Sequence, residues 1–291
     1  MPSNETASSK QARVWLITGA GSGLGRALVD AVLAQGDCVA GTVRRPADAQ
    51  VLEALAPGRV MVVRLDVTDA PGVRTAVAAV EARFGGRIDV LVNNAGYGLV
   101  AGVEEASLAE VRAQFEVNVF GALSMMQAVL PAMRRRRAGT IVNVTSVSGL
   151  VGWPGLGIYS GSKFALEGIS ETLAQEVAGF GIRVVMVEPG GFRTDFAGRS
   201  RALAAQPIND DGYLDGALGA CKRTLDAHAG HERGDPARAA LAICKVVAAE
   251  AAPLRLLLGA DALGYVLGKQ AHQQAELARW LEVTTSTDFP G

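Results

Sequence analysis

The chain has 291 residues, 49% of them hydrophobic, and is long enough to bury the core of one large α/β domain. Its formal net charge is -1 at pH 7, which gives no electrostatic basis for binding nucleic acid or an anionic membrane. The three cysteines lie far apart, so we expect free thiols, a reducing cytoplasmic environment and no redox motif. His228 and His231 have a spacing that could suit a metal, but no cysteine lies near them, and we expect a surface pair and no metal site.

Residues 1–12 are mostly polar and lack the apolar segment of a signal peptide, which predicts a disordered tail. No apolar run reaches the roughly 18 residues of a membrane span, so we expect no membrane association. The basic run from Arg134 to Arg137 ends a helical pattern, where positive charge complements the helix dipole.

The first predicted strand, at residues 13–18, is followed at once by a glycine turn and then by a helical pattern that ends near Gly36. Glycines let the backbone approach a ligand, and the helix N-terminus offers unpaired N–H groups to a phosphate. This arrangement predicts a dinucleotide-binding turn, although a plain strand-to-helix turn is the alternative. The predicted cofactor contacts in the turn are Gly19, Ser22, Gly23, Leu24 and Gly25.

The second predicted strand, at residues 38–43, runs directly into Arg44 and Arg45. A site that prefers NAD usually offers a carboxylate here to the ribose 2'-hydroxyl, whereas a guanidinium suits a 2'-phosphate. The sequence therefore favours NADP(H), with NAD(H) as the other candidate. A solvated arginine without a ligand is the competing interpretation.

Two further strands end in candidate cofactor contacts. The run at residues 60–69 contains Asp66, and the run at residues 88–92 leads into Asn93, Ala95 and Gly96. Continuous apolar character suits parallel strands that are covered on both faces. The small and amide residues line a cofactor groove or, alternatively, form an Asx-type turn.

A helical pattern covers residues 108–137 and is interrupted near Asn118 and at Pro131. An asparagine inside a helix with a glycine three residues later lowers helix propensity, which functional positions tolerate. We therefore consider Asn118 a candidate functional residue.

The fifth predicted strand, at residues 140–146, delivers Ser146, and Tyr159 and Lys163 follow on one face of a helix start. A free tyrosine has a pKa of about 10. An ammonium roughly 4 Å away would lower that pKa by about 3 units at an effective dielectric constant near 20. This spacing predicts an acid that works at pH 7, with Ser146 holding the same substrate oxygen, although an ordinary surface pair is the alternative.

The remaining chain completes the alternation of strands and helices. A helix follows Lys163, strands are predicted at residues 182–190 and 254–259, and helices are predicted at residues 235–251 and 261–282. We expect an α/β Rossmann-type fold, with a doubly wound seven-stranded parallel sheet and helices on both faces, as a single domain over residues 13–291. The predicted contacts at the carboxyl ends of its strands would then share one crevice. The segment at about 190–236, rich in glycine and polar residues, is expected to form a mobile lid over that crevice, with a helix near 212–228.

Taken in order, these motifs resemble the classical short-chain dehydrogenase/reductase family over roughly residues 12–282. The matching pieces are TGAGSGLG at 18–25, LDVTD at 65–69, NNAG at 93–96, Asn118, Ser146, YSGSK at 159–163 and PGGFRT at 189–194. The resemblance implies an oxidoreductase that uses NAD(P)(H). It also implies that Tyr159 is the acid/base, that Lys163 lowers its pKa and binds the nicotinamide ribose, that Ser146 orients the carbonyl, and that Asn118 holds a water.

The resemblance also implies cofactor contacts beyond the catalytic group. Asp66 would contact adenine, Asn93 the ribose region and Thr194 the carboxamide. The other expected contacts are Val67, Ala95, Gly96, Tyr159, Lys163, Pro189 and Gly190.

The long C-terminal part resembles family members that act on hydroxysteroids, retinoids or similar apolar ketones. Candidate pocket residues, for which ordinary packing is the alternative, are Tyr97, Leu99, Val151, Trp153, Leu156 and Phe192. We therefore expect hydride transfer between NADP(H) and a small-molecule ketone or secondary alcohol. A non-catalytic NADP(H)-binding regulator and an epimerase or dehydratase are the alternative functions, and assembly as a dimer or tetramer is open.

Overall fold

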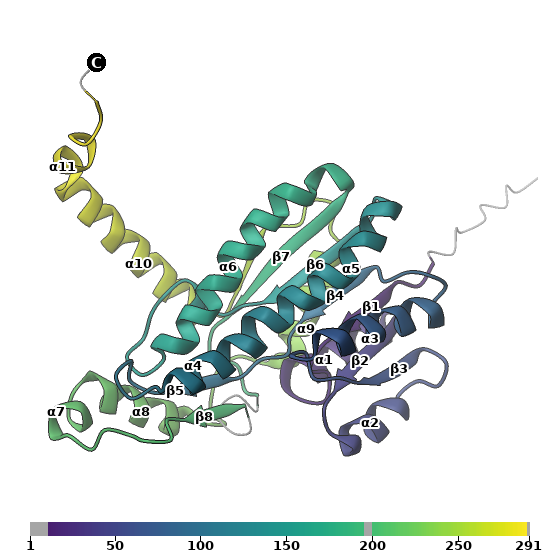
Figure 1. Cartoon of the computed structure of the whole chain (residues 1–291), viewed down its shortest axis with the longest axis horizontal. Helices are drawn as coiled ribbons and strands as arrows, with labels where there is room; N and C mark the ends of the chain where they lie inside the picture. The colour runs from purple at the N-terminus through teal and green to yellow at the C-terminus, as the bar shows by residue number, and fades with distance from the viewer. Residues whose placement is uncertain (1–10, 195–199, 290–291) are drawn as a thin grey trace, which may run out of the picture.

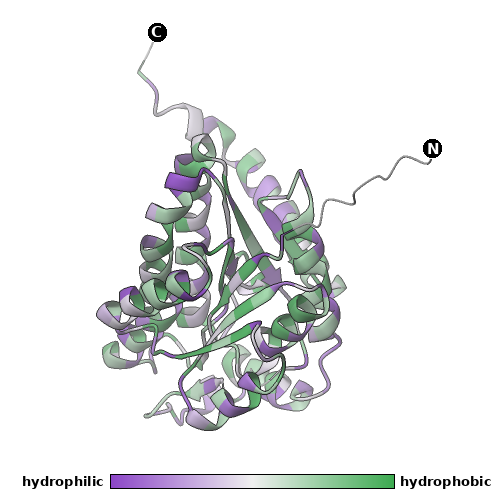
Figure 2. Cartoon of the chain, turned by 90° about the vertical axis from the view of Figure 1, so that its right-hand side faces the viewer, coloured by the Kyte–Doolittle hydropathy of each residue, from purple (hydrophilic) through white to green (hydrophobic). Residues whose placement is uncertain are grey.

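The computed structural model describes residues 11–194 and 200–289. A parallel seven-stranded sheet runs through it in the order β3-β2-β1-β4-β6-β7-β9, with helices on both faces (Figures 1 and 2). The expected doubly wound Rossmann-type sheet is therefore confirmed. Its strands are β1 (Val14–Ile17), β2 (Cys38–Val43), β3 (Val60–Arg64), β4 (Val90–Asn93), β6 (Gly139–Val144), β7 (Ile182–Pro189) and β9 (Arg255–Leu258).

The helices that flank the sheet follow the predicted amphipathic segments. On one face lie α3, α5 and α6, and on the other lie α1 and α9. The bounds are α1 (Gly23–Ala34), α2 (Pro46–Glu53), α3 (Ala70–Arg83), α4 (Leu108–Phe115), α5 (Ala122–Arg136), α6 (Gly157–Val177), α9 (Pro236–Ala248), α10 (Ala260–Arg279) and α11 (Leu281–Thr285), with short 3-10 turns η2 (Val147–Gly149) and η3 (Ala178–Phe180).

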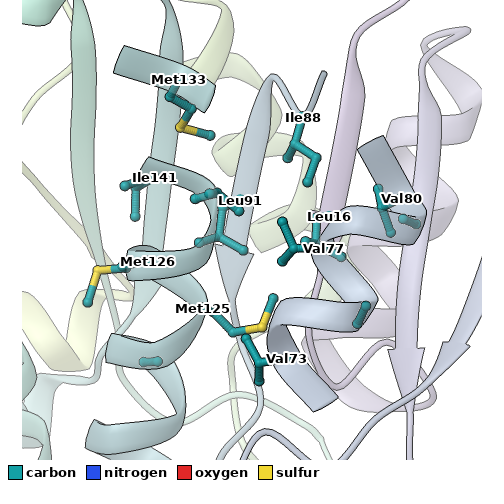
Figure 3. Close-up of a cluster of buried hydrophobic side chains, with 14 of the residues drawn as sticks. Leu16, Val73, Val77, Val80, Ile88, Leu91, Met125, Met126, Met133 and Ile141 are labelled. Carbon is teal, nitrogen blue, oxygen red and sulfur yellow. The ribbon is translucent and has the colours of Figure 1, made fainter. Parts of the chain in front are cut away.

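The central strands divide their side chains between two separate cores. Leu16 packs on the face covered by α3 and α5, whereas Trp15 and Ile17 pack on the face covered by α1 and α9. Successive side chains of a strand point to opposite faces, so a strand with both faces covered is apolar throughout. Figure 3 shows the first core, where Met125 of α5 and Val73 of α3 lie close together below Leu91.

The predicted interruption at Asn118 is a widened turn of π-helix, η1 (Glu116–Gly121), between α4 and α5. Such turns occur frequently at functional sites. Pro131 lies inside α5 and does not end it.

By length and composition, the continuous helix Leu108–Arg136 could cross a membrane, with a mean hydropathy of 1.2 over its most apolar window. In the fold it packs against the sheet, and 44% of that window is buried. Met125, Met126 and Met133 are fully buried among α3 and the sheet. The expectation of no membrane association stays a prediction.

A second, two-stranded parallel sheet was not predicted. It pairs β5 (Gly98–Val100) with β8 (Arg201–Leu203), and it is followed by α7 (Asp211–Leu214) and α8 (Ala217–His228). Of these elements, β8, α7 and α8 belong to the expected lid segment, and α7 and α8 correspond to its predicted helix. Residues 195–199 of that segment and residues 1–10 of the expected tail lie outside the described residues.

Candidate active site

A crevice of about 1160 Å³ opens at the carboxyl ends of the central strands. Residues that follow β1, β2, β4, β6 and β7 line it, and residues of β8 and α8 line it from the lid side. The strand order reverses direction at β1, between β2 and β4, and the crevice of a doubly wound sheet is expected at such a point.

The glycine turn after β1 forms the nucleotide end of the crevice. Gly19 has a φ of +67°, and a Cβ there would lie 3.0 Å from the Cα of Ala95. An added Cβ at Gly25 would collide with the carbonyl of Gly19, so both positions require bare backbone. Ser22, Gly23 and Leu24 line the crevice, where the unpaired N–H groups of the first turn of α1 suit a phosphate. The turn therefore fits a dinucleotide.

Two arginines after β2 have different environments. Arg45 makes a bidentate pair with Asp48, at 2.8 and 2.7 Å, and Asp48 also lies against Gly21. Arg44 is exposed at the crevice, and its guanidinium makes no ion pair with the residues that the structure describes. Arg44 is therefore available to a phosphate, while its neighbour is already engaged. The sequence did not single out Asp48, since nothing in its spacing shows this pairing.

Asp66 and Val67 line the crevice beside Arg44. Asp66 accepts hydrogen bonds from the Thr68 main-chain N–H at 3.0 Å and the Thr68 hydroxyl at 2.8 Å. These bonds, together with the Arg44 charge, hold the pKa of Asp66 below its usual value. The carboxylate is thus ionised and fixed in orientation at pH 7.

The amide that lines the crevice after β4 is Asn94, and the expectation for Asn93 needs correction. Asn93 is buried and donates to the Asn143 side chain at 2.8 Å, inside the core. Asn94 donates to the carbonyls of Thr18 and Gly19, at 2.9 and 3.2 Å, and so braces the glycine turn. Alternation along the strand directs the two neighbours to opposite sides, which the motif alone did not reveal. Ala95 and Gly96 line the crevice as expected.

Tyr159, in the first turn of α6, meets Ser146, which follows β6. Tyr159 is 7% exposed and Ser146 is 9% exposed. Burial raises the pKa of Tyr159 to about 12, and a hydrogen bond with Ser146 opposes this shift. The Ser146 oxygen also accepts from the Ser148 N–H at 3.0 Å, which fixes its position. At neutral pH the phenol is therefore protonated and can act as a proton donor.

Lys163 does not lower the pKa of Tyr159 in the way that its spacing predicts. Its ammonium donates to the Val144 carbonyl at 2.8 Å and lies 5.8 Å from the centre of the Tyr159 ring. Burial lowers the pKa of Lys163 to about 8, and the nearby Glu167 carboxylate opposes this shift. The prediction considered one attraction and omitted desolvation, which disfavours the charged form of both groups.

Asn118 lies beside the crevice without lining it. Its side-chain nitrogen donates to the Tyr97 carbonyl at 2.9 Å and the Ser162 hydroxyl at 3.1 Å, and its oxygen accepts from the Tyr97 N–H at 3.1 Å. The amide therefore holds the chain after β4 against α6. The expected water-holding role stays a prediction.

The end of β7 supplies the last predicted contacts. Pro189, Gly190 and Thr194 all line the crevice. Asp261, at the start of α10, accepts from the Gly191 N–H at 2.8 Å and occupies the space that a Cβ of Gly190 would need. Asp261 also lines the crevice, and its distance in sequence concealed this contact.

An apolar wall packs against Tyr159. Val100 and Leu156 are buried against its ring, and Trp153 and Leu225 pack on the same cluster. Of the expected pocket residues, Tyr97, Trp153, Leu156 and Phe192 line the crevice, whereas Leu99 and Val151 are not among its lining. The sequence missed Leu225, because the lid has no periodic pattern that fixes its position.

His228 and His231 are exposed and line the lid side of the crevice. His228 Nδ1 lies 2.8 Å from the Thr224 carbonyl. Within residues 11–194 and 200–289, no group of three or more His, Cys, Asp or Glu side chains is arranged to hold a metal.

A buried acidic cluster lies behind Lys163. Arg255 of β9 reaches Glu167 of α6 at 3.2 Å and Glu188 of β7 at 3.4 Å. Burial and the Glu167 charge raise the pKa of Glu188 to about 7, and Arg255 opposes that shift.

Comparison with known proteins identifies the chain's relatives. The family model described as short chain dehydrogenase matches residues 13–204. Oxidoreductase BOA17 of Botryotinia fuckeliana is 40% identical over 277 residues, which are 94% of this chain and 99% of the relative. The 3-ketodihydrosphingosine reductase of Bacteroides thetaiotaomicron is 40% identical over 86% of this chain and 88% of the relative. The NADPH-dependent 3-dehydrocapnine reductase of Ornithobacterium rhinotracheale is 34% identical over 69% of this chain and 72% of the relative.

Solved structures show the same fold. A short-chain dehydrogenase from Streptomyces avermitilis superposes with a TM-score of 0.89 at 43% identity, over 96% of this chain and all of that one. One from Burkholderia cenocepacia, in complex with NADP, has a TM-score of 0.71 at 29% identity, over 93% of this chain and 98% of that one. One from Burkholderia phymatum, in complex with NAD, has a TM-score of 0.79 at 27% identity, over 92% of this chain and 95% of that one. The chain belongs to the classical short-chain dehydrogenase/reductase family of oxidoreductases.

Proposed function

We propose that the protein is an NADP(H)-dependent reductase of apolar ketones, and in reverse a dehydrogenase of the matching secondary alcohols. The observation that carries the proposal is the hydrogen-bonded pair of Tyr159 and Ser146, buried between the glycine turn and the apolar wall. A ketone oxygen held by both hydroxyls would place its apolar substituents against Trp153 and Leu225.

The high pKa of Tyr159 suits the direction of reduction. A bound reduced nicotinamide supplies the hydride to the carbonyl carbon. Tyr159 holds a proton on its phenolic oxygen and would donate it to the carbonyl oxygen, which gains negative charge and becomes basic as hydride adds to the carbonyl carbon. A phenol with a pKa of about 12 remains a stronger acid than an aliphatic alcohol, so the transfer is downhill.

The other residues have positioning and electrostatic roles in this proposal. Ser146 orients the carbonyl through its hydroxyl, which the Ser148 N–H holds in place. The Lys163 ammonium, close to the Tyr159 ring, stabilises the negative charge that proton donation leaves on the phenol. The lid strand and α8 limit the access of water to the site.

The NADP(H) preference rests on Arg44. Its exposed guanidinium, beside the ionised Asp66, is suited to a 2'-phosphate. The named NADPH-dependent relative and the NADP complex of a related dehydrogenase support this choice, whereas the NAD complex keeps the second cofactor a candidate.

The substrate class follows from the apolar wall and from two relatives. The reductases from Bacteroides and Ornithobacterium are named for 3-ketodihydrosphingosine and 3-dehydrocapnine. We therefore propose a ketone that carries a long apolar chain. The test is a panel of long-chain ketones, short-chain ketones and steroid ketones, with oxidation of NADPH and NADH followed optically. Equal activity on short and long chains would contradict the substrate assignment, and NADPH binding without turnover on any carbonyl would favour a non-catalytic regulator.

A further inference from the structure

The C-terminal arm, defined here as residues 260–289, projects from the body of the molecule (Figures 1 and 2). Its base is anchored, since Tyr265 packs edge-on against Trp153 with ring centres 4.6 Å apart. Every residue from 271 to 289 is exposed. The arm is not one continuous helix, because Trp280, with a φ of -105° and a ψ of 13°, separates α10 from α11.

One stripe of side chains follows the arm on the face away from its anchor. We call it the seam, and its members are separated by four, three, four, three and four residues, which is the spacing of a coiled coil. The four leucines of the seam are between 51% and 57% exposed, and its two glutamines are exposed as well. The seam consists of Leu263, Leu267, Gln270, Gln274, Leu277 and Leu281.

The seam reads the same in both directions, as two leucines, two glutamines and two leucines with mirrored spacings. A two-fold interface requires this kind of self-complementarity, because each contact occurs twice with the partners exchanged. Two antiparallel arms with the axis at His272 would align two kinds of layer within α10. These layers pair Leu267 with Leu277 and Gln270 with Gln274 of the second copy, whereas Leu281, the counterpart of Leu263, lies beyond the break at Trp280.

The central glutamines explain the register. A polar residue inside a coiled-coil seam lowers stability but fixes alignment and strand number. Each side-chain amide can both donate and accept, so the two Gln270–Gln274 layers satisfy one another only when they meet at the centre.

Between residues 260 and 282, the charged residues of the arm avoid the seam and its two flanks. His272 Nε2 lies 3.4 Å from a carboxylate oxygen of Glu276 on the outer face. The others on that outer surface are Asp261, Lys269, Arg279 and Glu282. A coiled coil keeps its charged residues at such outer positions when its flanks are apolar or small.

The flanks obey the same two-fold symmetry. One flank holds only small residues, Gly264, Ala271 and Ala278, and this lets two backbones approach. Trp280, at the break between α10 and α11, is 59% exposed in the single chain. Exposed tryptophan at the edge of a leucine stripe indicates an interaction surface.

We infer that the arm pairs with the arm of a second copy of this chain as an antiparallel two-helix coiled coil. A lipid surface is a poorer occupant, because helices that lie on anionic membranes carry lysine and arginine along the polar face. Here Lys269 and Arg279 are balanced by Glu276 and Glu282, and the glutamines interrupt the apolar stripe.

Light scattering coupled to size-exclusion chromatography tests the pairing with a charge exchange. Leu267→Glu and Leu277→Lys should each halve the mass of the wild-type particle, because a charge is buried in two layers. The variant with both changes should regain the wild-type mass, since antiparallel pairing puts each introduced carboxylate opposite an introduced ammonium. Val283→Glu is the matched control, because Val283 is 57% exposed on the same arm but lies outside the seam.

Disulfide trapping tests the orientation. Ala271→Cys lies beside the two-fold axis and should form a linked dimer on mild oxidation, whereas Ala278→Cys, which would face Gly264, should not. Parallel arms would link neither variant, because they place the two copies of each of these residues on opposite sides of the interface. The wild-type chain, with Cys38, Cys221 and Cys244, controls for other cross-links.

Three results would overturn the inference. In the first, the wild-type chain is a monomer over the whole concentration range. In the second, it self-associates but both single variants keep the wild-type mass, which assigns assembly to another surface. In the third, the wild-type chain is a monomer that floats with vesicles of phosphatidylcholine and phosphatidylglycerol, and Leu267→Glu abolishes flotation, which assigns the arm to lipid.

Discussion

Lys222 of α8 lies 2.9 Å from the carboxylate of Glu105, whose side chain is only 1% exposed. Glu105 also accepts from the main-chain N–H groups of Gly102 and Ile208. Burial opposes ionisation, but these hydrogen bonds and the ammonium together lower the pKa of Glu105 below its usual value. One buried carboxylate thus ties the lid helix to the chain that follows β5.

Replacing Lys222 should therefore loosen the lid. In Lys222→Met, the Glu105 charge stays buried without its ammonium. Removing one partner of a fully buried ion pair lowers the free energy of unfolding by on the order of 3 kcal/mol. The loss should be smaller here, because Lys222 is 28% exposed. We expect faster amide hydrogen exchange in α8 and a higher KM, with smaller changes in the sheet. Lys245→Met, an exposed lysine of α9, should leave both unchanged. Unchanged exchange in α8 would show that the pair does not hold the lid.

The fold was predictable because both faces of the sheet are covered, which produces continuous apolar strands separated by amphipathic helices. The glycine turn, Tyr159 and Ser146 were predictable because their chemistry requires fixed local spacings. The pairing of β5 with β8 was not predictable, since it joins residues about a hundred positions apart and neither strand is long enough to show a period. The choice between Asn93 and Asn94 depends on the strand's alternation relative to the sheet, which a motif does not specify.

Tyr159→Phe should lower kcat by at least about 100-fold, because it removes the proton donor. NADPH affinity should stay within about twofold, since the ring and its packing remain. Stopped-flow measurement of NADPH oxidation and a fluorescence titration separate the two effects. Turnover close to the wild type would eliminate Tyr159 as the acid.

Ketone reduction should decrease as the pH rises through about 8, the pKa of Lys163. Above that value Lys163 is neutral and no longer stabilises the charge left on Tyr159, whereas the Tyr159 pKa of about 12 keeps the phenol protonated throughout. A profile of kcat from pH 6 to 10 measures this. Lys163→Met should be slow and nearly independent of pH in that window; a wild-type rate that is constant to pH 10 would contradict the role of the ammonium.

Glu188→Gln should stabilise the protein at alkaline pH. The folded-state pKa of Glu188, about 7, lies above its usual value of 4.5, so the folded state binds more protons between these values and stability is lost as the pH rises through 7. Glutamine mimics the protonated form, and the gain at pH 8.5 approaches about 3 kcal/mol, whereas at pH 5 the two proteins should be similar. Urea unfolding at both pH values measures the difference. Glu171→Gln is the control, because it removes a half-exposed carboxylate from the same Arg255, and it should give no gain in stability at either pH. An equal gain in stability at both pH values in Glu188→Gln would show that ionisation is not the cause.

Arg44→Ala should weaken NADPH binding by about 10- to 100-fold, the effect of losing a charge-assisted hydrogen bond, and leave NADH binding nearly unchanged. Arg45→Ala is the neighbouring control, and its effect on the ratio of the two affinities should be smaller because Arg45 already pairs with Asp48. Fluorescence titration with both cofactors gives the ratio, and measurement at two salt concentrations identifies the charge contribution, which screening reduces. If Arg44→Ala weakens NADH and NADPH equally, the guanidinium supports the adenosine end in general and does not select the 2'-phosphate. If Arg45→Ala shifts the ratio more than Arg44→Ala does, the phosphate contact belongs to Arg45, released from Asp48 when the cofactor binds.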